Sequence, residues 1–286
     1  MPRRSARLPR ILGATAVALS VAPPLEAQAV RKFPEDPRVQ VVTIPGKLPK
    51  PRQAAIVLPA GYASGARRYA VLYLLHGYGG GYDNWLTRTN LLAYTADLPL
   101  IVVMPDAGNS WYANAVRDTT QRFEDYVARD VVDYVDANYR SLPFPQARFI
   151  GGLSMGGYGA LMLSLKNPGK YSLAASISGA AGPVRTSTDM ELEAVFGPVG
   201  SEARKAADLV ERLRTADPKR LPYFYLDCGT SDGLLASNRE VTAVLAERGI
   251  PYEYHETHGA HEWEYWDRRI QVVLGLVRER IAALGR

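Results

Sequence analysis

Residues 148–157 read Arg-Phe-Ile-Gly-Gly-Leu-Ser-Met-Gly-Gly, the strongest structural signal in the chain. They predict a short strand over 148–151, a sharp turn at Ser154 and a helix over 155–166. Because the backbone of a serine on such a turn is strained, its neighbours two positions away must be nearly free of side chains. Gly152 and Gly156 meet that requirement. A turn rich in Gly and Ser would explain the composition alone, but the strand and helix around it favour a nucleophilic serine.

Short apolar runs alternate with amphipathic helical segments along the rest of the chain. The runs at 69–75 and 100–104 are nearly continuous, as in strands buried on both faces. Further strands are expected over 39–44 and 54–58, as an antiparallel hairpin, and over 173–178, 223–227 and 252–256. This order predicts an α/β fold, a mostly parallel, doubly wound sheet with helices on both faces. Residues 182–221 fit poorly and are expected to form a small excursion carrying one helix over 201–214.

A serine nucleophile needs a base, and the base needs an acid to orient it. On a strand–turn–helix of this kind, the acid and then the histidine follow the serine in sequence. His76 precedes Ser154, and His255 lies inside an expected strand. His261, in the loop before the last helix, is expected to open that helix and is the favoured base. His258, in the same loop, remains the alternative.

Two aspartates border the loop that follows the expected strand at 223–227. Asp232 lies further out on the loop, where its carboxylate can reach His261, and is the favoured acid. Asp227 is the alternative, although it is better placed to cap the end of the strand. Asp106, which follows an earlier strand, fits a positioning or structural role.

The sequence does not favour a metal site or a disulfide framework. Cys228 is the only cysteine, so neither an intramolecular disulfide nor a Cys-rich metal site is possible. The spacing of His255, His258 and His261 resembles a set of metal ligands. The first of them lies in a strand, however, and Gly259 interrupts the periodicity, so we expect no metal.

Residues 74–80, Leu-Leu-His-Gly-Tyr-Gly-Gly, follow a buried strand and are rich in glycine. Such a turn allows a backbone N–H to point at a reacting carbonyl, with a second N–H supplied by the residue after the nucleophile. The expected oxyanion donors are therefore the amides of Tyr78 and Met155. A phosphate-binding loop is a weak rival, since neither G-x-G-x-x-G nor Gly-Lys-Ser/Thr is present. Trp111, Tyr112 and Trp263 are candidates to line a substrate pocket.

The N-terminus has the three parts of a secretory signal peptide. Arginines at positions 3, 4, 7 and 10 precede an apolar stretch over 11–22, and Ala27-Gln28-Ala29 supplies a cleavage site. The apolar stretch is shorter than the roughly 20 residues needed to span a bilayer, so stable membrane insertion is not expected. We therefore predict a signal peptide over 1–29, a single catalytic domain over 30–286, and a secreted or periplasmic location.

The net charge of +5 and the pI of about 9.2 suggest nucleic-acid binding at first sight. The predicted leader, however, contains four arginines and one glutamate. Of the 34 basic and 29 acidic residues, 30 and 28 remain without it, a net charge of +2. The chain is then nearly neutral, and no nucleic-acid partner is expected.

The chain resembles the esterase D-type branch of the α/β-hydrolases, which includes feruloyl and acetyl-xylan esterases, S-formylglutathione hydrolases and secreted mycolyltransferases. The resemblance rests on residues 74–80 and 152–157, on Cys-Gly-Thr-Ser-Asp at 228–232, and on Gly-Ala-His-Glu-Trp-Glu-Tyr-Trp at 259–266. It implies an α/β-hydrolase fold and no cofactor. By position, it makes Ser154 the nucleophile, Asp232 the acid and His261 the base, with Tyr78 and Met155 as oxyanion donors.

These observations predict a secreted serine carboxylesterase that hydrolyses acyl or aromatic esters, of feruloyl or acetyl type, through an acyl-enzyme at Ser154. The expected partner is a small-molecule or carbohydrate ester. S-formylglutathione hydrolases act in the cytosol, which argues against that activity for a chain with an export signal. An acyltransferase using the same acyl-enzyme and a non-catalytic binding module are the alternatives. The acyl chain, the alcohol and the oligomeric state stay open.

Overall fold

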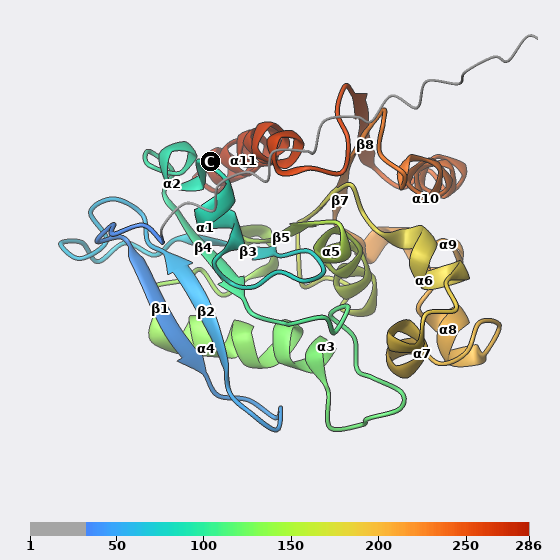
Figure 1. Ribbon diagram of the computed structural model, residues 1–286. Helices are drawn as coiled ribbons and strands as arrows, with labels where there is room; N and C mark the ends of the chain where they lie inside the picture. Colours follow the sequence, from blue (N-terminus) through green and yellow to red (C-terminus); the bar gives the residue numbers. More distant parts are fainter. Residues whose placement is uncertain (1–32, 286) are drawn as a thin grey trace, which may run out of the picture. The chain divides into compact units, whose positions relative to one another are not determined.

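An eight-stranded sheet forms the centre of the computed structural model, which describes residues 33–285 (Figure 1). The predicted signal peptide over 1–29 lies outside the described residues. The strands are β1 (Val39–Ile44), β2 (Arg52–Val57), β3 (Ala70–Leu75), β4 (Leu100–Pro105), β5 (Arg148–Leu153), β6 (Leu173–Ile177), β7 (Tyr223–Gly229) and β8 (Tyr252–Thr257).

The strand order is β1-β2-β4-β3-β5-β6-β7-β8. β2 pairs antiparallel with both β1 and β4, and every other pair is parallel. The predicted mostly parallel sheet with an antiparallel start is therefore confirmed.

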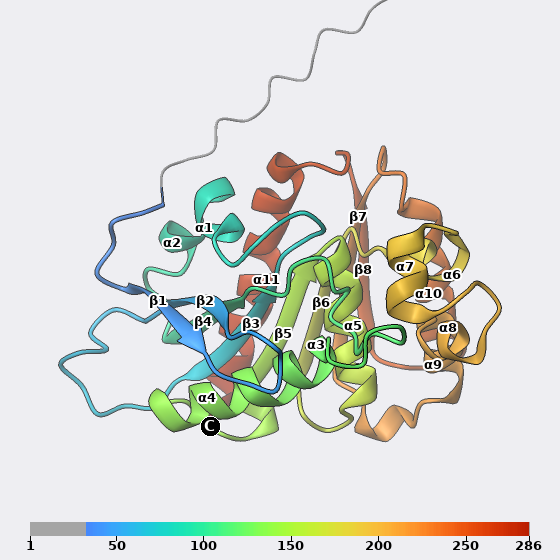
Figure 2. The ribbon, with the colours of Figure 1, turned by 60° about the horizontal axis from the view of Figure 1, so that its bottom comes forward.

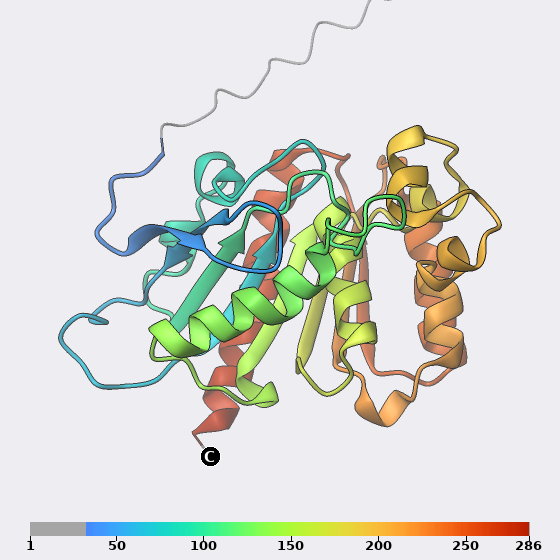
Figure 3. The ribbon, with the colours of Figure 1, turned by 90° about the horizontal axis from the view of Figure 1, so that it is seen from below.

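Helices cover both faces of the sheet, because side chains along each strand alternate between two apolar layers. Val71, Tyr73 and Leu75 of β3 face one layer, whereas Leu72 and Leu74 face the other. The first layer is covered by α3 (Phe123–Asp125), a π-helical turn η1 (Tyr126–Asp130), α4 (Val131–Asn138), α5 (Met155–Lys166) and α10 (Leu235–Glu247). The second is covered by α1 (Asn84–Arg88), α2 (Leu91–Tyr94) and α11 (Trp263–Leu284). Figure 3 shows α4 and α5 in front of the sheet and α11 behind it.

The excursion expected over 182–221 is present, but the prediction of one helix over 201–214 is wrong. The segment carries four short α-helices, α6 (Ala181–Thr186), α7 (Met190–Phe196), α8 (Glu202–Ala206) and α9 (Leu209–Thr215), followed by a 3-10 helix, η3 (Pro218–Arg220). The expected helix is broken at Asp208, whose side chain accepts a hydrogen bond from the N–H of Val210 and so caps a new helix. We call α6–α9 the insertion; Figure 2 shows it beside α10, at the β8 end of the sheet.

The order of the strands places a crevice between β3 and β5. β4 pairs with one side of β3, and β5 pairs with the other. In open α/β sheets ligands bind at such a reversal, beyond the carboxyl ends of the strands. The segments that follow β3 and β5 contain Tyr78 and Ser154, so both border this crevice. In the described part of the chain, we find no helix long and apolar enough to cross a membrane.

Candidate active site

Ser154 lies on a strained turn between β5 and α5. Its φ of +52° is in a region that non-glycine residues rarely adopt. A Cβ atom placed on Gly152 would lie 2.5 Å from the carbonyl carbon of Gly156, and one on Gly156 would lie 2.5 Å from the carbonyl oxygen of Leu75. These contacts are too short for real atoms, so both glycines are required by the close approach of α5 to β3 and β5.

Three side chains from separate loops form a hydrogen-bonded chain. Nε2 of His261 lies 2.9 Å from Oγ of Ser154, and Nδ1 lies 2.9 Å from Oδ2 of Asp232. The histidine comes from the loop after β8, and the aspartate from the loop after β7. Parallel strands end at one edge of the sheet, which brings these distant parts of the sequence together.

Asp232 is suited to remain ionised beside the histidine. Burial opposes its charge, but hydrogen bonds from His261 and from the N–H of Leu234 outweigh this, so the pKa of Asp232 lies below its usual value. A buried carboxylate at Nδ1 fixes the tautomer in which Nε2 can accept a proton from a serine hydroxyl.

The alternatives for the base and the acid lie elsewhere. His258 is exposed, and its carbonyl accepts a hydrogen bond from Arg268. Asp227 does not cap the end of its strand, because β7 continues to Gly229. It is fully buried and accepts hydrogen bonds from Tyr225, Tyr265 and Arg269. His261 lies two residues before α11 rather than opening it, since the helix begins at Trp263.

The two expected oxyanion donors have free N–H groups. Within residues 33–285, neither the amide of Tyr78 nor that of Met155 donates a hydrogen bond to the protein. Met155 directly follows Ser154, and Tyr78 lines the same two cavities as Ser154. The carbonyl oxygen of Gly77 accepts hydrogen bonds from His76 and from the N–H of Gly80. Because C=O and N–H point in opposite directions across a trans peptide, holding this carbonyl also fixes the direction of the Tyr78 N–H.

Sequence reasoning placed His76 outside the set of candidate bases but missed what it does. Its Nε2 accepts a hydrogen bond from the N–H of Ala107 at 3.0 Å, so Nδ1 carries the proton that is donated to Gly77. Burial lowers the pKa of His76, which keeps the ring neutral. Asp106 lies 3.8 Å away, in keeping with its expected structural role. The only signal in the sequence was the His-Gly pair after a buried strand.

Asn109 was also missed. Its Oδ1 accepts a hydrogen bond of 2.8 Å from the N–H of Gly79, next to Tyr78. The glycine-rich loop after β3 is thus held from two sides, by His76 and by Asn109. Nothing in the local sequence around residue 109 indicates this contact, which depends on the packing of two loops.

A cavity of about 570 Å³ opens at Ser154 and His261. Tyr78 and Trp111 form part of its wall, and the insertion supplies another part with Asp189, Glu191 and Leu192 among other residues. The hydroxyl of Tyr78 donates a hydrogen bond to the carboxylate of Glu191. This contact connects the loop after β3 with α7, and it raises the pKa of Tyr78.

The three expected pocket residues lie in three different places. Trp111 lines the cavity described above. Tyr112 does not: it is 1% exposed, and its hydroxyl donates to the carbonyl of His76, so its expected role in the pocket is wrong. Trp111 and Tyr112 both have a φ of +55°, a conformation that non-glycine residues rarely adopt. Trp263 lines a smaller cavity of about 300 Å³, and Ser154, His261 and Arg88 line the same cavity.

The part of the chain that the structure describes has no group of side chains suited to bind a metal ion. There, no three His, Cys, Asp or Glu side chains are grouped as a metal ion would require. His255 pairs with Glu253, and His261 with Asp232. His255 and His261, two of the three regularly spaced histidines, therefore engage different carboxylates.

The doubly wound sheet, the strained serine and its hydrogen-bonded His and Asp define the architecture of a serine hydrolase with the α/β-hydrolase fold. A profile of the family described as "Putative esterase" matches residues 46–275. The chain belongs to this esterase family, which confirms the resemblance seen in its motifs.

Two relatives illustrate this membership, and one solved structure illustrates the fold. An acetyl esterase of Caldicellulosiruptor saccharolyticus is 31% identical over 216 residues, which cover 70% of this chain and 79% of the relative. Esterase Rv1288 of Mycobacterium tuberculosis (strain ATCC 25618 / H37Rv) is 32% identical over 260 residues, or 80% of this chain, but the chain spans only 57% of that protein's length. A solved structure of a ferulic acid esterase superposes with a TM-score of 0.72 at 24% identity, covering 85% of this chain and 99% of the other.

Proposed function

We propose that this chain is a serine carboxylesterase that works through an acyl-enzyme at Ser154. The observation that carries the proposal is the chain of hydrogen bonds from Asp232 through His261 to Ser154, at 2.9 Å each. Family membership supports the same reaction class, and two free N–H groups beside the serine supply the place for an oxyanion.

In the first half of the reaction, Oγ of Ser154 attacks the ester carbonyl while Nε2 of His261 removes the hydroxyl proton. The carbonyl oxygen becomes an oxyanion, and the N–H groups of Tyr78 and Met155 donate hydrogen bonds to it. His261 then returns the proton to the leaving alcohol, and the acyl group stays on the serine.

In the second half, a water molecule gives a proton to His261 and attacks the acyl carbon. The same two N–H groups stabilise the second oxyanion. When it collapses, the carboxylic acid leaves, and Oγ of Ser154 recovers its proton from His261. Throughout, Asp232 holds the ring in one tautomer and stabilises the imidazolium that forms twice in each turnover.

The charges in the larger cavity support an alcohol portion that is neutral and rich in hydroxyl groups. The carboxylates of Asp189 and Glu191 line the same cavity as Ser154, and no Lys or Arg of the described residues lines it. Carboxylates accept hydrogen bonds from hydroxyl groups but repel anions. We therefore propose acetyl-type or feruloyl-type esters of carbohydrate as substrates, with Trp111 providing apolar surface.

An export signal over residues 1–29 completes the proposal. The basic, apolar and small-residue parts of this segment support a secreted or periplasmic enzyme. Carbohydrate polymers lie outside the membrane, where such an enzyme would meet its substrate.

Labelling with a fluorophosphonate probe tests the nucleophile directly. We expect wild type to be labelled and Ser154→Ala to remain unlabelled, with Ser187→Ala, a serine in the wall of the same cavity, labelled like wild type. Equal labelling of wild type and Ser154→Ala would contradict the assignment of Ser154 as the nucleophile. A panel of acetyl and feruloyl esters of xylo-oligosaccharides, set against p-nitrophenyl acetate, then tests the substrate class.

A further inference from the structure

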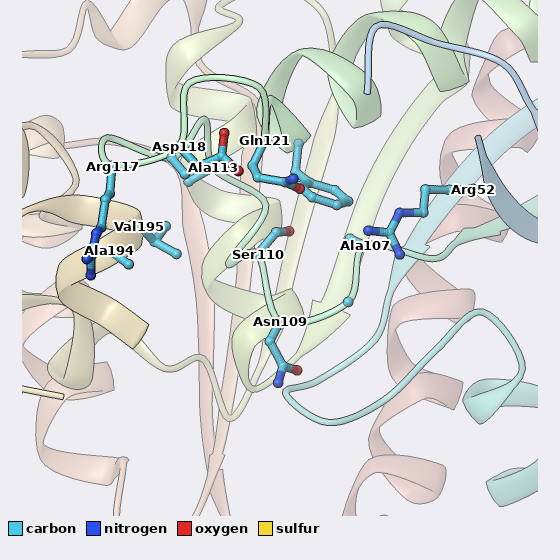
Figure 4. Close-up of a pocket in the computed structure, with 13 residues that line it drawn as sticks. Arg52, Ala107, Asn109, Ser110, Ala113, Arg117, Asp118, Gln121, Ala194 and Val195 are labelled. Atoms are coloured by element: carbon cyan, nitrogen blue, oxygen red, sulfur yellow. The ribbon is translucent and has the colours of Figure 1, made fainter. Parts of the chain in front are cut away.

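A second cavity, of about 540 Å³, is lined by residues of β2, of the loop after β4 and of α7 (Figure 4). It has no lining residue in common with the larger catalytic cavity. Both are nevertheless bounded by the loop after β4 and by α7: Trp111 and Leu192 face the catalytic cavity, whereas Ser110 and Val195 face the second one. Its volume is within the range of about 300–1,000 Å³ that is usual for small-molecule sites.

The two cavities differ in charge. The charged groups lining the catalytic cavity are mainly carboxylates, whereas the second cavity is lined by two guanidinium groups, from Arg52 on β2 and from Arg117 on the loop after β4, and by one carboxylate, from Asp118. Figure 4 shows these two side chains at opposite ends of the cavity, with Ala107 and Ser110 between them.

Arg52 is a partly buried cation that lacks hydrogen-bond acceptors. Its side chain is 34% exposed, and its Nε atom is fully buried without a partner in the described structure. Oδ2 of Asp106 lies 3.8 Å from Nη1, so the two side chains form an ion pair but the distance is too long for a hydrogen bond. The guanidinium lies 5.0 Å from the centre of the Phe123 ring, which covers one of its faces but offers no acceptor in its plane.

Each of the two nearby carboxylates uses one oxygen, Oδ1, to accept hydrogen bonds within its own loop. Oδ1 of Asp106 accepts a hydrogen bond from the N–H of Gly108 at 2.9 Å. Oδ1 of Asp118 accepts two from Thr120, which lowers the pKa of Asp118. Arg117 is exposed and makes no side-chain hydrogen bond or ion pair among residues 33–285. Within the same residues, the buried Nε of Arg52 therefore remains a donor without an acceptor.

We propose that this second cavity binds a small carboxylate with an apolar body. Its carboxylate meets the guanidinium of Arg52 through charge-assisted hydrogen bonds, which are stronger than those between neutral groups. Its apolar part lies against Ala107, Phe123 and Val195, and Arg117 at the other end attracts the anion from solution. This site is separate from the proposed esterase reaction and does not depend on it.

Calorimetric titration of Ser154→Ala protein with trans-cinnamate and with its neutral analogue cinnamamide tests the proposal. We expect cinnamate to bind more tightly than cinnamamide. Arg52→Gln should weaken cinnamate binding by about tenfold or more, the effect of losing a hydrogen bond to a charged group, and Arg117→Gln should weaken it by less. Arg278→Gln, at an arginine paired with Asp97 outside the cavity, serves as the matched control and should leave the affinity unchanged.

Two further measurements locate the binding. Val195→Trp retains both arginines but fills the cavity, and should abolish binding even if Arg52→Gln proves unstable. Wild type labelled with a fluorophosphonate has its catalytic cavity occupied, and should still bind cinnamate. The proposal is overturned if acid and amide bind equally, if no binding is detected, if Val195→Trp binds normally, or if labelling removes the binding. The titrations of Ser154→Ala and of its arginine and Val195 variants are decided independently of whether Ser154 is the nucleophile; only the titration of labelled wild type requires a reactive Ser154.

Discussion

His261 and Asp232 are 29 residues apart in sequence, yet Nδ1 of the histidine lies 2.9 Å from Oδ2 of the aspartate. The side chain of Asp232 is fully buried, whereas that of His261 is 37% exposed. The pair therefore joins a shielded negative charge to a ring that remains accessible to substrate. This asymmetry is what a base requires if it must form an imidazolium during the reaction.

Asp232→Asn should reduce kcat by about 10⁴-fold while the protein stays folded, since the amide cannot hold the required tautomer. Asp227→Asn is the matched control from the same region. It should instead lower the free energy of unfolding by about 3–5 kcal/mol, because it leaves the partly buried Arg269 without its counter-charge. Steady-state kinetics on p-nitrophenyl acetate and urea denaturation of both variants separate the two roles. Equal losses of activity per folded molecule would contradict the assignment of the acid.

Gly156→Ala should destabilise the fold, because the new methyl group would lie 2.5 Å from the carbonyl oxygen of Leu75 and 2.6 Å from that of His76. Forcing atoms into such a space costs about 1–3 kcal/mol or more. Gly275→Ala, in α11, has open space around its Cβ position and should raise stability by about 1 kcal/mol. Thermal unfolding followed by circular dichroism checks both signs. A stable Gly156→Ala variant would show that α5 and β3 can separate without penalty.

His76 should make stability depend on pH. Its pKa is lowered by burial in the folded protein, whereas in the unfolded chain the ring binds a proton near pH 6.5. As the pH falls below about 6.5, the ring of His76 therefore becomes protonated in the unfolded chain while it stays neutral in the folded protein. This difference lowers the free energy of unfolding by at most about 1.4 kcal/mol per pH unit.

His76→Gln tests this effect, because its side-chain oxygen can still accept from the N–H of Ala107 but does not titrate. Urea denaturation at pH 7.5 and 5.5 should show a smaller difference for the variant than for wild type. Identical differences in the two proteins would rule out His76 as a source of the pH dependence.

Glu191→Lys should change the preference of the enzyme among substrates. The carboxylate lies in the wall of the catalytic cavity, so reversing its charge should raise kcat/KM for an ester with an anionic alcohol portion relative to a neutral one. Glu202→Lys reverses a charge on α8, away from the lining of the cavity, and is the control. If both variants show the same ratio as wild type, the alcohol portion does not contact this wall.

Much of the fold follows from local sequence. Alternating apolar runs and helical segments predicted the parallel sheet, and the helix over 155–166 has the same bounds in the structure. The insertion was harder to predict, because its four short helices lack the long apolar periodicity that distinguishes a helix in sequence. Its place in the wall of the catalytic cavity depends on contacts such as that of Glu191 with Tyr78.

Ser154, His261 and Asp232 were selected from sequence because strand order and loop position limit which residues can meet at one edge of a parallel sheet. That selection also explains the errors at Tyr112 and Asp227. The sequence shows that these residues lie near strand ends, but side-chain direction there is decided by packing. The hydroxyl of Tyr112 is drawn inward to the carbonyl of His76, and Asp227 faces the interior toward Tyr265.

The sequence by itself determined the type of fold, the strained turn and the family of this protein. These depend on residue types at fixed spacing, above all the glycines around Ser154, where no other side chain fits. Only the tertiary structure decided how His76 and Asn109 hold the loop of Tyr78, and that two cavities of different charge share one loop. Such features arise where segments distant in the chain pack together, and there the geometry of the whole sheet sets each distance.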